Sequence, residues 1–140
     1  DHLSRFKNLY DGGFKWLIEN SISFQNTFHQ HGYTATGPGH FVIASGKHPG
    51  PAGVLGNSYY DRALGKVVNC VEDVKAKTVG GDGLARSFTR YNNKMIGDVL
   101  KSNNPKSKVI SIAGKDRSAV MMGGQNADLV LYYNNIDKCY

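Results

Sequence analysis

Strand and helix patterns alternate over the last third of the chain. Residues 108–114 (KVISIAG) form a short, β-branched apolar run, which is typical of a buried parallel strand. A helix pattern precedes this run, a loop with a short helix (KDRSAVMMGG, 115–124) follows it, and residues 127–133 (ADLVLYY) predict a final strand. In a chain of 140 residues, long enough for one domain with a core, this alternation predicts an α/β sheet.

The helix before that run is expected to extend from Phe88 to Lys101. Ser87 can cap its first turn, and the Asn-Asn-Pro sequence at 103–105 stops it. Apolar residues at helical spacing predict a buried stripe, made of Phe88, Tyr91, Met95, Ile96, Val99 and Leu100.

The first half of the chain predicts short elements joined by loops. The sequence has 17 glycines, and many of them fall between positions 32 and 83. Apolar spacing predicts two short helices within 2–20 with a break at Gly12-Gly13, a strand over 21–28 and a buried helix over 39–45. A loop is expected over 46–56. Turn signals then predict a hairpin that pairs 58–60 with 66–71 around a turn near Gly65, followed by a glycine-rich loop over 76–86.

The basic charge of the chain does not by itself indicate a nucleic-acid partner. The net charge is +6 and the pI is about 9.3, but the lysines and arginines are scattered, without a run or an interleaved aromatic stripe. We therefore expect a solvated basic surface and no nucleic acid, while a phosphate-bearing small molecule fits the charge equally well. No apolar run has the length of a membrane span. Because the chain opens at Asp1 without methionine, we expect an earlier natural start, and the lack of a signal peptide says little about location.

The cysteines and most histidines do not predict a metal site. Cys70 and Cys139 lie far apart without a C-x-x-C pair, so zinc bound by them is not expected, and free thiols or a disulfide both stay open. The histidines at 2, 29, 31 and 48 lack a spacing such as H-x-x-x-H. His29 and His31 are the nearest to a metal pair, but two ligands do not make a site.

Two polar segments are candidates for a ligand site. In open α/β sheets, ligands bind beyond the carboxyl ends of the strands. The loop after Phe28 would place Thr34 and Thr36 there, and the loop after Ile112 would place Lys115, Asp116 and Arg117 there. This arrangement hints at an anion site that faces a hydroxyl group.

Taken singly, each candidate has an ordinary structural interpretation. Thr36 precedes Gly-Pro-Gly, which is usually a turn, and a threonine hydroxyl needs a base or a metal to act as a nucleophile. Lys115 and Arg117 could hold phosphoryl oxygens, but Lys-Asp-Arg is more often a self-paired surface triplet. Asn57 could donate to an oxyanion or simply occupy a turn.

Five ordered motifs change this assessment. They are TGPGH at 36–40, GVLGNSYYD at 53–61, VNCVED at 68–73, IGDVLK at 96–101 and GKDRSAV at 114–120. Together they resemble the alkaline phosphatase superfamily, and most closely its single-subunit, zinc-dependent phosphatases with a threonine nucleophile, relatives of the nucleotide pyrophosphatase/phosphodiesterases. The resemblance covers nearly the whole chain. It implies a doubly wound, mostly parallel sheet with helices on both faces, of which this chain holds an incomplete part.

The resemblance also implies a role for each matching residue. Thr36 matches the threonine that forms the covalent phosphoryl intermediate and contacts zinc. Asn57 matches the asparagine that donates to a phosphoryl oxygen, and Lys115 and Arg117 match the pair that contacts the substrate phosphoryl group in the phosphomonoesterase branch. His40, in the Pro-Gly-His turn, is expected to be packed and hydrogen-bonded rather than a metal ligand.

The zinc ligands mark the departure from the family pattern. Its members bind two Zn2+ ions through aspartates and histidines, and apart from Thr36 we expect those ligands outside this sequence. Residues 1–140 are therefore expected to be the N-terminal portion of a larger catalytic domain, inactive and without bound zinc when isolated. The resemblance suggests a periplasmic or secreted setting.

The leading hypothesis is thus a metal-dependent phosphomonoesterase that acts on a small phosphate ester. One alternative is a phosphodiesterase or nucleotide pyrophosphatase of the same superfamily, and another is a non-catalytic phosphate-binding remnant. The sequence indicates neither the substrate nor the oligomeric state.

Overall fold

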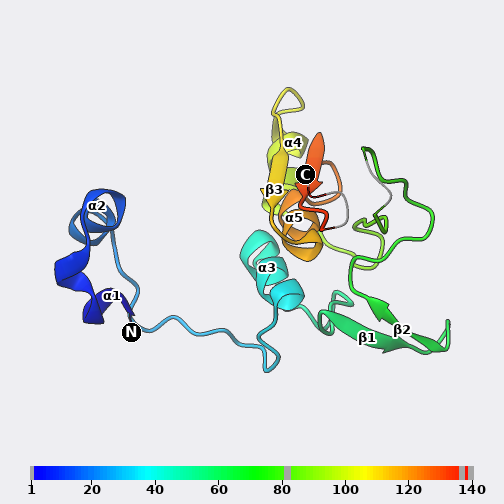
Figure 1. Ribbon diagram of the computed structural model, residues 1–140, viewed down its shortest axis with the longest axis horizontal. Helices are drawn as coiled ribbons and strands as arrows, with labels where there is room; N and C mark the ends of the chain where they lie inside the picture. Colours follow the sequence, from blue (N-terminus) through cyan, green and yellow to red (C-terminus); the bar gives the residue numbers. More distant parts are fainter. Residues whose placement is uncertain (1, 81–82, 136–137, 139–140) are drawn as a thin grey trace.

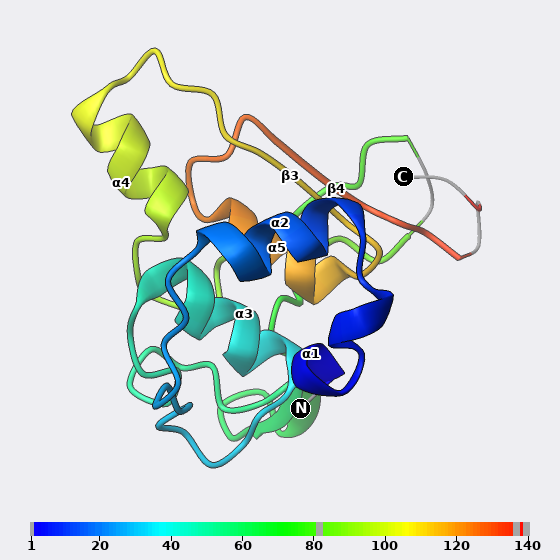
Figure 2. The ribbon, with the colours of Figure 1, turned by 90° about the vertical axis from the view of Figure 1, so that its left-hand side faces the viewer.

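The computed structural model describes residues 2–80, 83–135 and 138. Its first part is a group of short helices that stands apart from the rest, joined to it by an extended segment (Figure 1; Figure 2 views the molecule from that end, with α1 and α2 in front of α3). Every residue of these helices is exposed. They are α1 (His2–Arg5), the 3-10 helix η1 (Lys7–Leu9) and α2 (Gly12–Asn20).

The extended segment corrects one prediction. Residues 21–28 are mostly irregular, with one bend and one turn and no strand, and Ile22, Phe24 and Phe28 are each about four-fifths exposed. The alternating pattern is present in the sequence, but a strand needs a partner for its backbone groups. The expected helices within 2–20 are confirmed, with α2 beginning at Gly12.

The centre of the fold is a pair of packed helices beside a parallel strand pair. Helix α3 (Thr36–Ser45) packs against α5 (Asp116–Gly123), and α5 packs against strands β3 (Ile110–Ala113) and β4 (Leu129–Tyr132). These strands run parallel, with Ile110 opposite Leu129. The predicted short helix and the last two strands are confirmed, and α3 begins three residues earlier than expected.

Strand β3 is less buried than its apolar sequence predicts. Ser111 points inward, where its hydroxyl donates to the carbonyl oxygen of Ala119 at 2.7 Å. Ile110 and Ile112 lie on the opposite face and are about 60% exposed. The parallel pair is therefore covered on one face by α5, and its other face is open.

The predicted hairpin is confirmed. Strands β1 (Ser58–Asp61) and β2 (Lys66–Asn69) pair antiparallel and project from the helices (Figure 1). Gly65 completes the turn with a φ of 64°, a left-handed conformation that favours glycine. Residues 46–56 and the described part of 76–86 are irregular, as expected, apart from a bridge between Glu72 and Arg86.

The predicted helix over 88–101 is wrong in its first half. Helix α4 spans Ile96–Asn103, because the Asp98 carboxylate accepts the Met95 N–H at 2.8 Å and caps the helix there. Tyr91 and Met95 are buried as predicted, but from an irregular segment. The other members of the expected stripe are at least one-third exposed: Phe88, Ile96, Val99 and Leu100.

One core joins α3, α5 and the segments around them. Phe41 and Tyr91 meet edge to face with ring centroids 5.9 Å apart, and the Tyr91 hydroxyl donates to the Val120 carbonyl at 3.1 Å. The remaining buried members of this core are Ala44, Ala52, Val54, Cys70, Val71, Met95, Val120 and Met121. In the part of the chain that the structure describes, no helix is long and apolar enough to cross a bilayer.

Candidate functional site at two helix N-termini

Thr36 is the first residue of α3, and Asn57 is hydrogen-bonded beside it. The Gly37 N–H donates to Asn57 Oδ1 at 2.7 Å. This bond fixes the orientation of the amide, so its Nδ2 group points the other way, and Nδ2 makes no hydrogen bond within the described residues. A partly buried hydroxyl and a donor amide therefore lie together at a helix N-terminus, where the helix dipole favours an anion.

The close approach of these segments requires a glycine at position 37. A Cβ at Gly37 would lie 2.8 Å from Cys70 Sγ and 3.4 Å from Asn57 Oδ1. The Cys70 N–H in turn donates to the Asn57 carbonyl oxygen at 3.0 Å. The start of α3 is thus seated against the end of the hairpin without room for another side chain.

Cys70 is a buried thiol beside the start of α3. Burial raises the pKa of the Cys70 thiol to about 11, while the charge of Arg117 lowers it and that of Asp116 raises it. The thiol lies beside the first turn of α3, where a Cβ at Gly37 would come within 2.8 Å of its Sγ, and α3 packs against α5. Among the described residues Cys70 is a free thiol, and Cys139 lies outside them.

Lys115 and Arg117 flank Asp116 at the N-terminus of α5. Lys115 is exposed, whereas the Arg117 side chain is 23% exposed. The Arg117 Nε atom is buried and has no hydrogen-bond partner within the described part of the chain. A buried guanidinium donor without an acceptor is costly, and an oxyanion would satisfy it.

The expected self-paired triplet is only partly correct. Asp116 Oδ1 lies 3.7 Å from Arg117 Nη1, but the stronger pair is between Asp116 Oδ2 and Arg86 Nε at 2.7 Å. Sequence reasoning missed Arg86, which follows a glycine-rich loop and belongs to none of the five motifs. It placed Asp116 beside Lys115 and Arg117 but did not predict its pair with Arg86, and it missed the position of Cys70 beside α3, although both residues lie inside quoted motifs.

The histidines singled out in the sequence lie in two places, one at the start of α3 and the other around a separate pocket. His40 Nδ1 lies 2.8 Å from the Thr36 carbonyl oxygen, so the expected hydrogen bonding of His40 is confirmed. His29 and His31 meet edge to face with centroids 5.3 Å apart, and with His48 they line a pocket of about 340 Å³. Over residues 2–80, 83–135 and 138, no three His, Cys, Asp or Glu side chains are grouped so that they could hold a metal ion.

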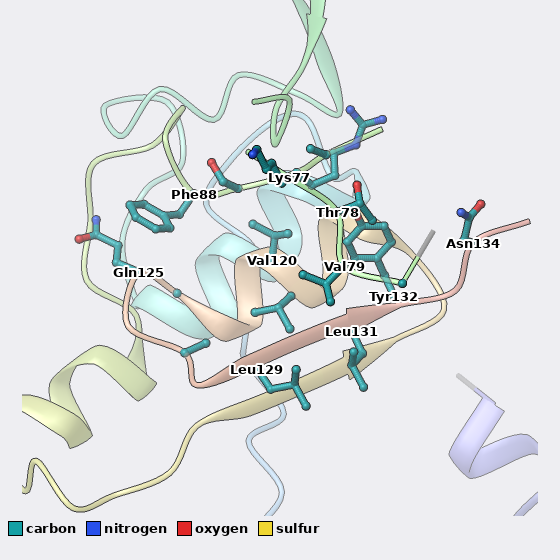
Figure 3. A pocket seen from close by; sticks show the side chains of 17 residues that line it. Lys77, Thr78, Val79, Phe88, Val120, Gln125, Leu129, Leu131, Tyr132 and Asn134 are labelled. Atoms are coloured by element: carbon teal, nitrogen blue, oxygen red, sulfur yellow. The ribbon is translucent and has the colours of Figure 1, made fainter. Parts of the chain in front are cut away.

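A larger pocket lies away from Thr36 and Asn57. It measures about 360 Å³ and lies between residues 77–80 and 85–88 on one side and strand β4 on the other (Figure 3). Leu129, Leu131 and Tyr132 line it from the strand, and Val120 lines it from α5. None of the four predicted site residues lines this pocket, so the candidate site is assigned to the N-termini of α3 and α5 and not to this pocket.

Comparisons with known proteins agree with the ordered motifs. The family model for type I phosphodiesterase / nucleotide pyrophosphatase matches residues 1–133. Alkaline phosphatase PhoV of Synechococcus elongatus is 37% identical over 140 residues, covering 97% of this chain and 26% of PhoV.

Solved structures of alkaline phosphatase PafA match the fold. Wild-type PafA matches with a TM-score of 0.91 and 29% identity, covering 99% of this chain and 28% of PafA. A PafA mutant with one threonine, one asparagine, one lysine and one arginine replaced matches with a TM-score of 0.94 and 26% identity, over the same shares. The chain is thus a mixed α/β fragment that corresponds to part of the PafA fold, and it spans about a quarter of the length of these relatives.

Proposed function

The chain belongs to the type I phosphodiesterase / nucleotide pyrophosphatase family of the alkaline phosphatase superfamily, and we propose that its parent protein is a metal-dependent phosphomonoesterase with Thr36 as nucleophile. Residues 1–140 would form the N-terminal portion of a larger, doubly wound catalytic domain. The exposed apolar side chains of α2 and of the outer face of β3 support this, because such surfaces are normally covered.

One observation supports the site above the others: the hydrogen bond from the Gly37 N–H to Asn57 Oδ1. It leaves the Asn57 amide free to donate to a phosphoryl oxygen next to the Thr36 hydroxyl. Preorganised donors of this kind stabilise the charge that develops in phosphoryl transfer.

Lys115 and Arg117 would bind the other phosphoryl oxygens. The unpartnered Arg117 Nε supports this role, because a phosphoryl oxygen would supply the missing acceptor. The PafA mutant adds support from residue types and spacing. Its replaced threonine and asparagine are separated by the same number of residues as Thr36 and Asn57, and its lysine and arginine are two residues apart, as Lys115 and Arg117 are.

The proposed reaction has two displacements. The Thr36 oxygen forms a bond to phosphorus as the ester P–O bond breaks and the alcohol leaves. Water then cleaves the phosphothreonine, which restores the hydroxyl and releases inorganic phosphate. The proposal includes two Zn2+ ions in the parent protein. Of their ligands this chain offers Thr36 alone, so we assign the others to segments outside this sequence.

A phosphodiesterase is the second candidate, favoured by the description of the matching family model. Comparing an aryl phosphate monoester with its diester in the full-length protein separates the two. We expect the monoester to be preferred, and Lys115→Ala and Arg117→Ala each to lower its kcat/KM by about 100-fold. If both variants keep full monoester turnover, the phosphomonoesterase assignment fails.

A non-catalytic phosphate-binding remnant is a third possibility that metal analysis would test. We expect the full-length protein to contain zinc, and its absence would favour the remnant. The isolated 140 residues are expected to have no turnover of an aryl phosphate even with added zinc. Activity of this fragment that disappears in Thr36→Ala would contradict that expectation. We also propose a periplasmic or secreted location, which fractionation of expressing cells would test.

A further inference from the structure

An ion pair that no motif contains lies behind the proposed phosphoryl-binding arginine. Arg86 Nε donates to Asp116 Oδ2 at 2.7 Å, and the two side chains are only 12% and 18% exposed. Among the ion pairs of the described residues this is the least exposed. Salt screens the attraction within a pair so withdrawn from water only weakly.

The backbone around Arg86 is held in place independently of its side chain. Arg86 forms an antiparallel bridge with Glu72, just after strand β2, and the Ser87 N–H donates to the Val71 carbonyl at 2.9 Å. The Ser87 hydroxyl donates to Asp73 Oδ2 at 2.7 Å. The guanidinium therefore reaches α5 from a fixed segment.

Both oxygens of Asp116 are engaged. While Oδ2 accepts from Arg86, Oδ1 accepts the Arg117 N–H at 2.7 Å and lies 3.7 Å from Arg117 Nη1. The pair with Arg86 thus keeps the carboxylate from rotating into a full, bidentate pair with Arg117. Arg117 in turn retains an unsatisfied Nε and an uncompensated share of its charge.

From this geometry we infer that Arg86 is a positioning residue, which acts through Asp116 to keep the Arg117 guanidinium available for a phosphoryl group. The inference rests on the proposed function of Arg117. Without Arg86, Asp116 turns to Arg117 and competes with the substrate for its donors. Supporting partners of this kind typically change activity by about 10–100-fold.

Kinetics of the full-length protein with an aryl phosphate test the inference through a double-mutant cycle of Arg86→Ala and Arg117→Ala. We expect Arg86→Ala to lower kcat/KM by about 10–100-fold and to weaken inhibition by inorganic phosphate. We expect Arg86→Lys to recover most of the lost kcat/KM and most of the inhibition by inorganic phosphate, because lysine keeps a cationic donor at this position. In the Arg117→Ala background, Arg86→Ala should have almost no further effect.

Arg90 provides the matched control. It pairs with Asp61 at 3.0 Å with side chains 17% and 21% exposed, and its Nε donates to the Glu72 carbonyl. Arg90→Ala should lower the unfolding midpoint about as much as Arg86→Ala but leave phosphate inhibition unchanged. The inference would be overturned if Arg86→Ala lowered kcat/KM by the same factor in the wild type and in Arg117→Ala. It would also be overturned if Arg90→Ala weakened phosphate inhibition as much as Arg86→Ala does. If the wild type instead shows no phosphatase activity, the proposed function fails, and binding of inorganic phosphate measured by calorimetry through the same cycle still tests the coupling.

Discussion

Two acidic residues lie in the first turns of two helices that follow one another along the chain, α4 and α5, and their surroundings differ. Asp98, in α4, is 1% exposed, and its oxygens accept four hydrogen bonds: from Met95 N–H, Gln125 N–H, and the backbone and side-chain amides of Asn126. Burial alone would raise the Asp98 pKa, but these bonds outweigh it, and the pKa lies below its ordinary value. Each carboxylate oxygen of Asp98 therefore accepts two hydrogen bonds.

Asp116, in α5, belongs to a cluster that is left incomplete. It pairs with Arg86, but its neighbour Arg117 has a buried Nε that no described residue satisfies. The saturated cluster joins α4 to the loop after α5, and the hydrogen-bonding capacity of the Asp98 carboxylate is used within it. The unsaturated cluster has an unpaired donor, Arg117 Nε, and positive charge that is not fully compensated, and a phosphoryl site requires both.

The largest expected effect comes from removing the saturated carboxylate. Asp98→Ala leaves three backbone donors without their acceptor, and each costs about 1–3 kcal/mol. We therefore expect the free energy of unfolding of the full-length protein to fall by at least about 3 kcal/mol, measured by urea denaturation.

Asp98→Asn keeps the volume and one acceptor, so it should fold and lose less than Asp98→Ala. For comparison, Asp73 accepts from Ser87 and the Lys75 N–H near the surface, and Asp73→Asn should cost no more than about 1 kcal/mol. If Asp98→Asn and Asp73→Asn are equally mild, the Asp98 cluster is not the structural anchor described here.

The unsaturated cluster should respond to phosphate, whereas the saturated one should not. At 100 times its Kd, inorganic phosphate should stabilise the wild type by about 2.7 kcal/mol, read as a rise in the thermal midpoint. Arg117→Ala should abolish this rise while leaving the ligand-free midpoint unchanged or higher, because it removes an unsatisfied buried donor.

Asp98→Asn should retain the full phosphate response from its lower starting midpoint. A response that is lost in Asp98→Asn and kept in Arg117→Ala would reverse the comparison.

The start of α3 packs so closely against Asn57 and Cys70 that one added methyl group should lower both stability and turnover. Gly37→Ala places a Cβ against Cys70 and Asn57, and overpacking of this kind costs about 1–3 kcal/mol. It should also lower monoester turnover, because it displaces the Asn57 amide. Gly39→Ala is the control in the same turn, where a Cβ would meet no atom within 4 Å. Equal turnover in the two variants would contradict the proposed contact.

The smallest effect concerns the buried Cys70 thiol beside the start of α3. Because burial raises the Cys70 pKa from 9.0 to about 11, the folded protein holds this proton more tightly than the unfolded chain. The contribution is complete below pH 9 and is lost as pH rises toward 11, by about 1 kcal/mol per pH unit. Urea denaturation at pH 8, 9 and 10 should show the wild type losing its advantage over Cys70→Ala; a constant difference would contradict the buried, protonated thiol.

Much of the fold was predictable where the local sequence decides it. The Gly65 hairpin, helix α5 and strand β4 follow from turn residues and apolar spacing. The strand over 21–28 and the early start of the 88–101 helix failed for a common reason. Each pattern was present, but its outcome depended on a distant partner: a neighbouring strand in the first case and the carboxylate of Asp98, bonded to Gln125 and Asn126, in the second.

The candidate site shows the same division. The identities of Thr36, Asn57, Lys115 and Arg117 came from ordered motifs, and the structure brings Asn57 against the start of α3. Arg86 and Asp116 lie 30 residues apart in the sequence, and their contact joins an irregular segment to a helix, so no periodic pattern in the sequence predicts it.

The most direct test of the account is the turnover of an aryl phosphate monoester by full-length Thr36→Ala. Thr34→Ala, two residues earlier and exposed, is the matched control. If Thr36 is the nucleophile, its loss should lower kcat by at least about 1,000-fold while Thr34→Ala keeps the wild-type rate. A smaller loss in Thr36→Ala, or an equal loss in both variants, would contradict the proposal that this helix N-terminus performs the phosphoryl transfer.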